Sequence, residues 1–270
     1  MYGESFEKKF MYYIKIGYSN GKKKPLVVID AGIHAREWIT HSSILIIAEH
    51  LINNINKYDK IFKKINVIIF PVLNPDGYVY TREKDRMWRG NRNININENC
   101  GVDINRNYPF KWSNSYWHCL TYPGTHGLSE LETLYHSFFL KKNKNNIKGY
   151  ISFHSYGRLI LFPWTHTTEY EPKDYYEIVI LGKKMKDKIK YHTNVSYQIG
   201  SASKLLYEAY GTTLDYIKSL GIKYTYVIEL SPSFDDQQSG FVVNENEIKK
   251  IGNEALIAFN EMLYQVYSEL

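Results

Sequence analysis

The fold is decided by the stretch Pro25-Leu-Val-Val-Ile-Asp-Ala-Gly-Ile-His-Ala-Arg-Glu-Trp38, which joins an apolar run to a cluster of polar side chains. The run Leu26 to Ala31 predicts a buried strand, and a segment with helical spacing follows it. Between them, His34, Arg36 and Glu37 lie within four positions. A strand that ends in this way can direct a histidine and a glutamate into one cleft. The stretch is therefore either a polar loop or two-thirds of a metal site.

Alternation of strand-length runs and helical segments continues along the chain. It predicts a single α/β domain with a mixed, mostly parallel, twisted sheet flanked by helices on both faces. In such sheets, function collects at the carboxyl ends of the strands. The region 80–127 shows no regular period, and an irregular segment of that length is more often functional than idle. The expected strands are 12–16, 26–31, 67–72, 150–154, 159–163 and 224–230, and the expected helices are 37–56, 129–142, 173–191 and 244–267.

The composition predicts a globular protein and argues against two classes of partner. With 270 residues, of which 44% are apolar, the chain can bury a sizeable core. The net charge is +6, but Lys and Arg are scattered among acids, Asn and Tyr, which argues against nucleic acid. No window approaches the roughly 18 apolar residues of a membrane span, and Met1 to Lys9 lacks the apolar core of a signal peptide. We therefore expect no membrane partner.

Two cysteines, Cys100 and Cys119, flank an irregular segment rich in Asn and Trp. The pair is compatible with a disulfide in a secreted protein and with two reduced thiols in a cytosolic one. Their number and spacing alone leave both interpretations open.

The candidate metal site needs a third ligand and a reactive partner. Catalytic zinc sites use three protein ligands and keep one position for water. His34 follows the first strand, Glu37 opens the helix, and His154 ends a strand that we expect to be a neighbour. The short His-x-x-Glu pattern is weak by itself, since it arises by chance in many chains. Glu229 strengthens it, because a carboxylate among apolar strand residues is costly unless it is paired or used, for instance as a general base.

The irregular region supplies cations and amides. Arg86-Met-Trp-Arg89 and Gly101-Val-Asp-Ile-Asn-Arg-Asn107 combine them with aromatic neighbours. Arginine suits bidentate binding of a carboxylate and stabilisation of a developing oxyanion. These are the requirements of an enzyme that recognises a free C-terminus and hydrolyses the bond before it.

With these motifs in place, the chain resembles a zinc metallocarboxypeptidase of the carboxypeptidase A/B type, peptidase family M14. The resemblance covers the chain nearly end to end. It is carried by Ile33-His-Ala-Arg-Glu-Trp-Ile39, Pro71-Val-Leu-Asn-Pro-Asp-Gly-Tyr78, Arg86-Met-Trp-Arg89, Asp103-Ile-Asn-Arg-Asn107, Phe153-His-Ser-Tyr156, Gly221-Ile-Lys-Tyr-Thr-Tyr-Val-Ile-Glu229 and the closing helix.

The resemblance implies a catalytic set. His34, Glu37 and His154 correspond to the ligands of one Zn²⁺, a ligand set known for the family. Glu229 corresponds to the general base that activates a zinc-bound water. Arg89 corresponds to the cation that polarises the scissile carbonyl and holds the oxyanion.

The resemblance also implies residues that bind and position the substrate. Some hold its terminal carboxylate, one tyrosine is mobile and closes over it, and others line the next subsite inward. Asp103 corresponds to the carboxylate that orients a ligand histidine. The carboxylate is held by Asn105 and Arg106 under the mobile Tyr207, and the inner subsite is lined by Arg36, Ser155 and Tyr156.

One position at the base of the family's specificity pocket separates enzymes that prefer apolar C-terminal residues from those that prefer basic ones. Leu214 stands there in this chain, and Asp215 follows it. An apolar floor disfavours a buried, unpaired charge, so we expect release of aromatic or large aliphatic residues. Thr165 and Thr212 stand where carboxypeptidase A has Gly, and Ala202 stands where it has a larger apolar residue.

The resemblance sets expectations for the whole chain. Residues 1–270 are expected to form the catalytic domain without the usual first helix, without an edge strand of a typical member, and with no propeptide or signal peptide. The family favours a disulfide between Cys100 and Cys119, an extracellular location and a monomer. The expected partners are peptides or proteins with a free C-terminus.

Two other functions share part of this pattern. A catalytically silent carboxypeptidase-like binding protein usually lacks a ligand or the base, and this sequence retains both. A zinc amidohydrolase of N-acyl amino acids would also use His-x-x-Glu. It would not need the carboxylate clamp together with an inner subsite.

Overall fold

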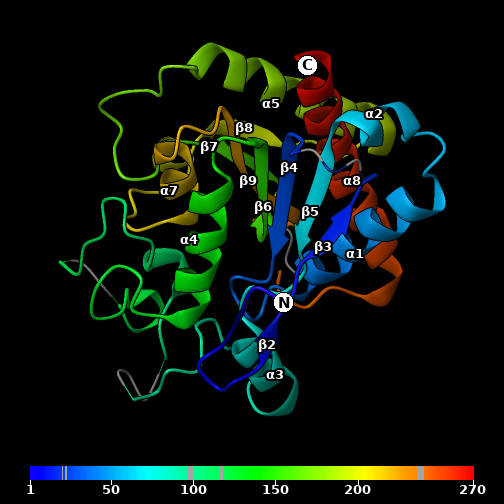
Figure 1. Cartoon of the computed structure of the whole chain (residues 1–270). Coiled ribbons are helices and arrows are strands. Elements are labelled where there is room, and N and C mark those ends of the chain that lie inside the picture. The colour runs from blue at the N-terminus through cyan, green and yellow to red at the C-terminus, as the bar shows by residue number, and fades with distance from the viewer. Residues whose placement is uncertain (20, 22, 96–99, 116–117, 236–239) are drawn as a thin grey trace.

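The structure is a computed structural model that describes residues 1–19, 21, 23–95, 100–115, 118–235 and 240–270. A seven-stranded sheet has the order β3-β5-β4-β6-β9-β7-β8, and a separate two-stranded sheet pairs β1 with β2 (Figure 1). In the large sheet, four pairings are parallel and two, β3 with β5 and β7 with β9, are antiparallel. The strands are β1 (Gly3–Glu4), β2 (Phe10–Met11), β3 (Ile14–Ile16), β4 (Leu26–Ala31), β5 (Asn66–Phe70), β6 (Ile147–Gly157), β7 (Leu159–Phe162), β8 (Gln198–Ser201) and β9 (Tyr224–Ser233).

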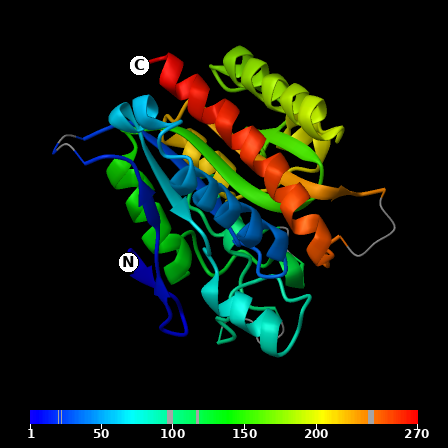
Figure 2. The same cartoon turned by 90° about the vertical axis from the view of Figure 1, so that its right-hand side faces the viewer.

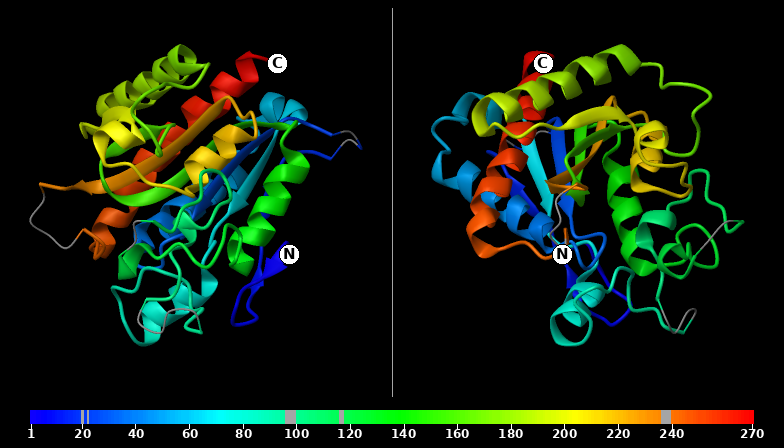
Figure 3. Two further views of the ribbon diagram at one scale, coloured as in Figure 1. Left: turned by 90° about the vertical axis from the view of Figure 1, so that its left-hand side faces the viewer. Right: turned by 180° about the vertical axis from the view of Figure 1, so that it is seen from behind.

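Helices cover both faces of the large sheet. On one face, α1, α5 and α8 enclose the larger hydrophobic core, and α5 runs beside α8 (Figures 2 and 3). On the other face, α4 and α7 enclose a second core. The helices are α1 (Trp38–Asn53), α2 (Asp59–Lys64), α3 (Pro75–Glu83), α4 (Leu131–Asn143), α5 (Tyr175–Thr193), α6 (Ala202–Leu205), α7 (Thr213–Ser219) and α8 (Glu245–Ser268), with single 3₁₀ turns at Ile104–Arg106 and Cys119–Thr121.

The burial of the central strands and of α8 explains why their apolar residues form patterns that predict a strand or a helix. All six residues of β4 and all five of β5 are buried, as expected of central parallel strands, which are covered on both faces and read as continuous apolar runs. In α8, Ile251, Ala255, Phe259 and Met262 recur at intervals of three and four and are buried, which is the helical period.

The side of the sheet along which the parallel strands end differs from the opposite side, along which they begin; these two sides are called its two edges. The carboxyl ends of β4, β6 and β9 meet at one edge, which α3 and the irregular segment after it cover at the bottom of Figure 1. At the opposite edge, shown at the top of the same view, lie α2 and the C-terminus. The fold thus separates a loop-rich edge from an edge where strands begin.

The predicted α/β architecture and the ten predicted elements are confirmed, with end points that shift by a few residues. The expected strand 67–72 ends at Phe70, and the region predicted to be irregular from Tyr80 overlaps α3, which ends at Glu83. The helices that the sequence did not reveal are α2, α6 and α7, which have at most seven residues and are too short to show a period, and α3, which has nine.

The cysteine and membrane expectations can also be compared with the structure. Cys100 and Cys119 form a disulfide, with Cα atoms 5.7 Å apart. In the described ranges, we find no helix that is both long enough and apolar enough to cross a bilayer.

Replacement of Phe259 by Ala tests the larger core. Phe259 is fully buried in α8, so we expect Phe259→Ala to lower the free energy of unfolding by about 3–5 kcal/mol, as large-to-small core substitutions do. Phe138→Ala is the matched control, since Phe138 is 57% exposed on α4 and should change stability by about 0.5 kcal/mol at most. Urea unfolding of the three proteins measures both values, and equal losses would contradict the assignment of the core.

Candidate active site

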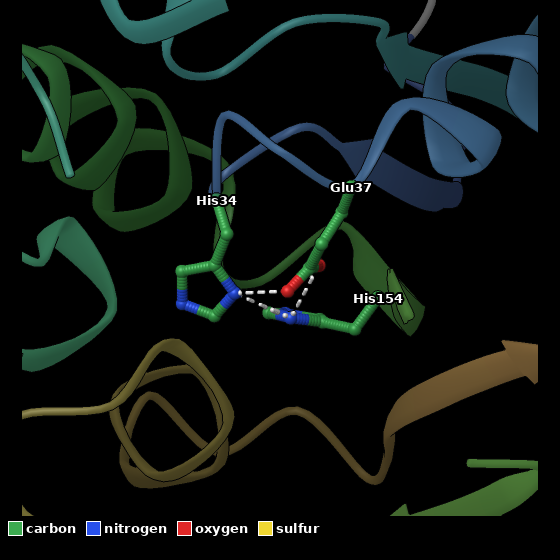
Figure 4. Close-up of side chains that lie close together, drawn as sticks. All are labelled: His34, Glu37 and His154. Atoms are coloured by element: carbon green, nitrogen blue, oxygen red, sulfur yellow. Dashed lines mark hydrogen bonds and ion pairs between the residues drawn. The ribbon is translucent and has the colours of Figure 1, made fainter. Parts of the chain in front are cut away.

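Three polar side chains converge where β4 and β6 end. His34 follows β4, Glu37 is the N-cap residue of α1, and His154 lies in β6. His34 Nδ1 lies 2.7 Å from Glu37 Oε1 and 3.2 Å from His154 Nδ1, and His154 Nδ1 lies 3.3 Å from Glu37 Oε2 (Figure 4). All three side chains are buried. The residues that the sequence singled out as metal ligands are therefore brought together.

A tight turn delivers His34 to this cluster. Gly32 has a φ of +69°, and a Cβ atom at this position would lie 1.8 Å from Cε1 of His41. Only glycine avoids both the backbone strain and the clash. The glycine that precedes the motif is thus required to bring the histidine back over the end of the strand.

The cluster has the properties of a cation site. Ligand atoms of the two histidines and the glutamate lie within 4.8 Å of one another, and no other such group of His, Cys, Asp or Glu occurs in the described residues. Two imidazole nitrogens and two carboxylate oxygens face one another here. Two histidines and one carboxylate are a donor set that suits zinc, so the residues present fit this metal.

The electrostatics of the cluster also favour a cation. Burial opposes ionisation of Glu37, but His34 and His154 hold the pKa of its carboxyl below the ordinary value. Burial likewise lowers the pKa of His154, yet Glu37 outweighs it and raises this pKa to about 9. The carboxylate of Glu37 therefore favours positive charge on the adjacent ring of His154, and a metal ion bound here would supply that positive charge instead.

Asp103 links the cluster of His34, Glu37 and His154 to Arg89. Its Oδ1 lies 3.4 Å from His34 Nε2, and its Oδ2 accepts hydrogen bonds from Nε and Nη2 of Arg89 at 3.1 and 2.9 Å. Burial alone would raise the pKa of Asp103, but Arg89, Arg106 and His34 hold it well below its usual range. Asp103 is therefore an ionised carboxylate that orients the ring of His34 and the fork of Arg89 at the same time.

Glu229 lies directly beside the cluster. It pairs in register with His154, because β9 and β6 are parallel neighbours, and its side chain lines the same cleft. Burial raises the pKa of Glu229 to about 8; Glu37 adds to the rise, while His154 and Arg89 oppose it. A carboxylate whose pKa lies near neutrality can take up and release a proton at ordinary pH.

A second set of polar side chains lines the same cleft as the candidate metal ligands. Arg106 donates from Nη1 to Asn105 O at 2.9 Å and from Nη2 to the Tyr207 hydroxyl at 3.2 Å. Asn105 Oδ1 accepts from Thr213 N, which fixes the amide and leaves its Nδ2 donor for a ligand. Tyr207 is 56% exposed, whereas Asn105 is buried. These donors can hold a carboxylate under a tyrosine that is itself little constrained.

Beyond this polar group the cleft continues into an apolar pocket. The cleft has a volume of about 270 Å³. Leu214 lies in the buried part of α7 and packs with Leu161, Ala202 and Val227. Further lining comes from Thr165, Leu206, Ala209 and Thr212.

Asp215, next to Leu214, does not make this pocket acidic. Its Oδ1 accepts from Thr165 N at 2.8 Å, and its Oδ2 accepts from the main chain and Nδ1 of His166 at 2.9 and 2.7 Å. The carboxylate is 1% exposed and does not line the cleft. Its charge is therefore used to hold the pocket wall and is not offered to a substrate.

Aromatic rings form the outer wall of the cleft. Tyr156 lies 5.0 Å from Phe241 and 5.6 Å from Phe234 between ring centroids. The guanidinium of Arg36 stacks on Phe241 at 4.2 Å. Ser155, the neighbour of Tyr156, also lines the cleft and donates its N–H to Glu37 Oε2. The outer wall is thus aromatic, and Arg36, which was predicted to line a subsite, stacks on one of its rings but does not itself line the cleft.

Sequence reasoning missed several residues of the cleft. Phe234 and Phe241 come from the segment between β9 and α8, which carries no periodic signal. Val227 could have been found, because it is two residues before Glu229 and so shares its face of the strand. The two phenylalanines had no comparable signal, since only the path of the chain brings them to Tyr156.

Comparison with known proteins agrees with the site. Residues 1–258 match the family model described as zinc carboxypeptidase. Bovine carboxypeptidase O is 33% identical over 99% of this chain and 72% of its own length, and rat carboxypeptidase B2 is 37% identical over 98% of this chain and 64% of its own length. The crystal structure of thrombin activatable fibrinolysis inhibitor superposes with a TM-score of 0.92 at 34% identity, covering 100% of this chain and 69% of that one.

These proteins share the fold and a common family description, and the match spans nearly the whole chain. Members of the family are metallopeptidases that use one Zn²⁺, and the cluster of His34, Glu37 and His154 provides a site for it. The chain therefore belongs to the zinc carboxypeptidase family.

Proposed function

We propose that this chain removes single residues from the C-termini of peptides and proteins, with a preference for aromatic or large aliphatic residues. One observation carries the proposal. The metal cluster with Glu229 lies across one cleft from Arg106 and Asn105, and an apolar pocket opens beside them. This arrangement supports recognition of a free carboxylate next to the bond that is cut.

In this proposal each residue has a separate task. His34, Glu37 and His154 hold the metal. A bound zinc ion lowers the pKa of water and polarises a carbonyl group. Glu229 takes the proton from the attacking water and returns it to the leaving amine.

Arg89 stabilises the negative charge that develops on the carbonyl oxygen. Its Nε and Nη2 are engaged by Asp103, which leaves Nη1 for that oxygen. The Asp103 carboxylate is shared with His34, so the metal ligand and the cation are held by one group. Such support keeps both in place before the substrate arrives.

Exopeptidase action follows from the position of Arg106. A guanidinium and an amide donor that bind the terminal carboxylate fix the last peptide bond over the metal cluster. The Tyr207 hydroxyl accepts a hydrogen bond from Arg106 Nη2, and its exposed side chain is free to close over a bound substrate. Ser155, Tyr156, Phe234 and Phe241 line the cleft and contact the residues before the scissile bond. Arg36, which stacks on Phe241, adds a cation to this wall.

The apolar preference rests on Leu214 and Asp215 together. The side chain of Leu214 supplies the pocket floor, and the neighbouring carboxylate is already saturated by Thr165 and His166. A basic side chain would be buried without a counter-ion. The names of the relatives, carboxypeptidase O and carboxypeptidase B2, do not indicate which C-terminal residue this chain prefers.

The disulfide supports an extracellular location. Disulfides persist in oxidising compartments and are rare in the cytosol, and Cys100 is bonded to Cys119. With a free peptide C-terminus as the ligand, the cleft of one chain is complete, which supports action as a monomer.

Metal content and Glu229→Gln test the catalytic set. We expect about one zinc ion per purified chain and loss of peptide hydrolysis after chelation, restored by added zinc. Glu229→Gln should keep the zinc but lower kcat by about 10²–10⁴-fold, the range of general acid–base catalysis. Glu49→Gln, at an exposed position on α1, is the control. A Glu229→Gln enzyme with zinc and wild-type kcat would disprove the assigned base.

Arg106→Met tests the carboxylate clamp and separates a carboxypeptidase from an amidohydrolase. Truncating one partner of a charged pair costs ~2–5 kcal/mol, so kcat/KM for a peptide with a free C-terminus should fall by roughly 30-fold or more. The same peptide with an amidated C-terminus should be a poor substrate for the wild type and be little affected by the substitution. Arg82→Met, on the exposed side of α3, is the matched control. Equal hydrolysis of both peptides by the wild type would rule out the clamp.

Matched peptides test the pocket. For a series that differs only in the last residue, kcat/KM should be highest for Phe or Leu and lower by about 100-fold for Lys, because the ammonium would be buried unpaired. A Glu-terminated peptide, which is also charged, is the second comparison. The assignment of Leu214 and Asp215 would be wrong if the Lys peptide gave the highest value.

A further inference from the structure

The edge of the sheet opposite the cleft gathers lysines that look scattered in the sequence. Here the parallel strands begin and the helices before them end, so segments far apart in the chain reach the same end of the sheet: β3, the residues around α2, the residues leading into β4, and those from the end of α4 to the start of β6 (Figure 2). Nine exposed lysines belong to these segments, and we call them the lysine edge: Lys15, Lys23, Lys57, Lys60, Lys64, Lys141, Lys142, Lys144 and Lys148.

The charges of the lysine edge are not neutralised by acids. Within the part of the chain that the structure describes, no ion pair of 4.0 Å or less joins any of the nine to a carboxylate. The acids at this edge are engaged elsewhere: Asp59 pairs with Lys63 at 2.6 Å, and Glu269 pairs with Lys223 at 3.3 Å. The edge therefore carries a concentrated positive charge, although the whole chain has only +6.

Helix stabilisation accounts for only part of this arrangement. Lysines in the last turn of a helix interact favourably with its dipole, and Lys64, Lys141 and Lys142 are in such positions. The other six lie in strands, in connections or before a last turn. Their gathering at one edge has no such structural explanation.

The lysine edge is also hollowed. One cleft of about 340 Å³ is lined by Lys15 and Lys23 together with the amides of Asn66, Asn143 and Asn146. A second cleft, of about 480 Å³, is lined by Lys144, Lys148 and Lys223 together with Glu269, the partner of Lys223, and the C-terminal Leu270. The segment 143–148 contributes to both clefts, so the two lie next to the same segment.

We propose that the lysine edge binds a linear sulfated polysaccharide. Ammonium groups placed at intervals suit sulfate groups along a chain, and the asparagine amides can bond to sugar hydroxyls. Few rings that could stack on nucleic-acid bases are offered, because Tyr58 and Phe62 are fully buried, Lys64 covers Tyr267, and Tyr18, which lines the first cleft, is half-buried. The disulfide supports a compartment in which such polysaccharides occur. This inference is independent of the proposed peptidase specificity.

Binding to dextran sulfate, with neutral dextran as the reference, tests the inference. The wild type should bind dextran sulfate and not dextran, and its affinity should fall as salt rises. Changing Lys60, Lys64, Lys144 and Lys148 together to Gln should weaken binding by about tenfold or more at 0.1 M salt. The matched control changes the same number of lysines elsewhere, namely Lys183, Lys186, Lys188 and Lys249, and should stay within about threefold of the wild type.

Three outcomes would overturn the inference. Equal losses in the two quadruple variants would mean that only net charge matters. Tighter binding to duplex DNA or to phosphatidylserine vesicles, at equal charge concentration, would assign the edge to another class of partner. Absence of binding to dextran sulfate would disprove the inference. The melting temperature and the hydrolysis of a small peptide are measured on the same sample to show that the protein is folded.

Discussion

The parallel pairing of β4, β6 and β9 is the constraint on which the site depends. Parallel neighbours in register bring their carboxyl ends to one level, so His154 and Glu229 face one another across a ladder and His34 follows at the end of the next strand. A slip of one residue would turn Glu229 to the opposite face of the sheet. The buried apolar runs that fix this register, most clearly in β4, therefore determine the catalytic geometry as well as the stability of the core.

The parts that could be predicted from sequence are those with strong local or chemical signals. Long runs and long helices revealed the architecture, because β4 is a continuous apolar run and α8 buries one face with the helical period. The His34-x-x-Glu37 pattern was weak by itself, and the metal ligands could be named only when His154, Glu229 and the resemblance to a family were added. Resemblance to a family supplied the roles of Arg89, Arg106 and Tyr207, which spacing alone would not have given.

The remaining parts arise only when distant segments meet. The saturation of Asp215 by Thr165 and His166 depends on a loop that lies some fifty positions earlier in the chain. Phe234 joins Tyr156 through the path taken after β9. The lysine edge is the clearest case: charges that look dispersed in sequence are collected, because strand beginnings and helix ends share one side of an α/β sheet.

Asp103 touches both His34 and Arg89, and this has a consequence for assembly. The metal ligand follows a central strand, whereas the aspartate and the arginine belong to the long irregular segment. Ordering that segment and completing the metal site are therefore thermodynamically linked. Free energy gained when a cation binds is shared with a loop that has little regular structure of its own. Metal occupancy of the site and the ordering of Arg89 are thus two measures of a single cooperative unit.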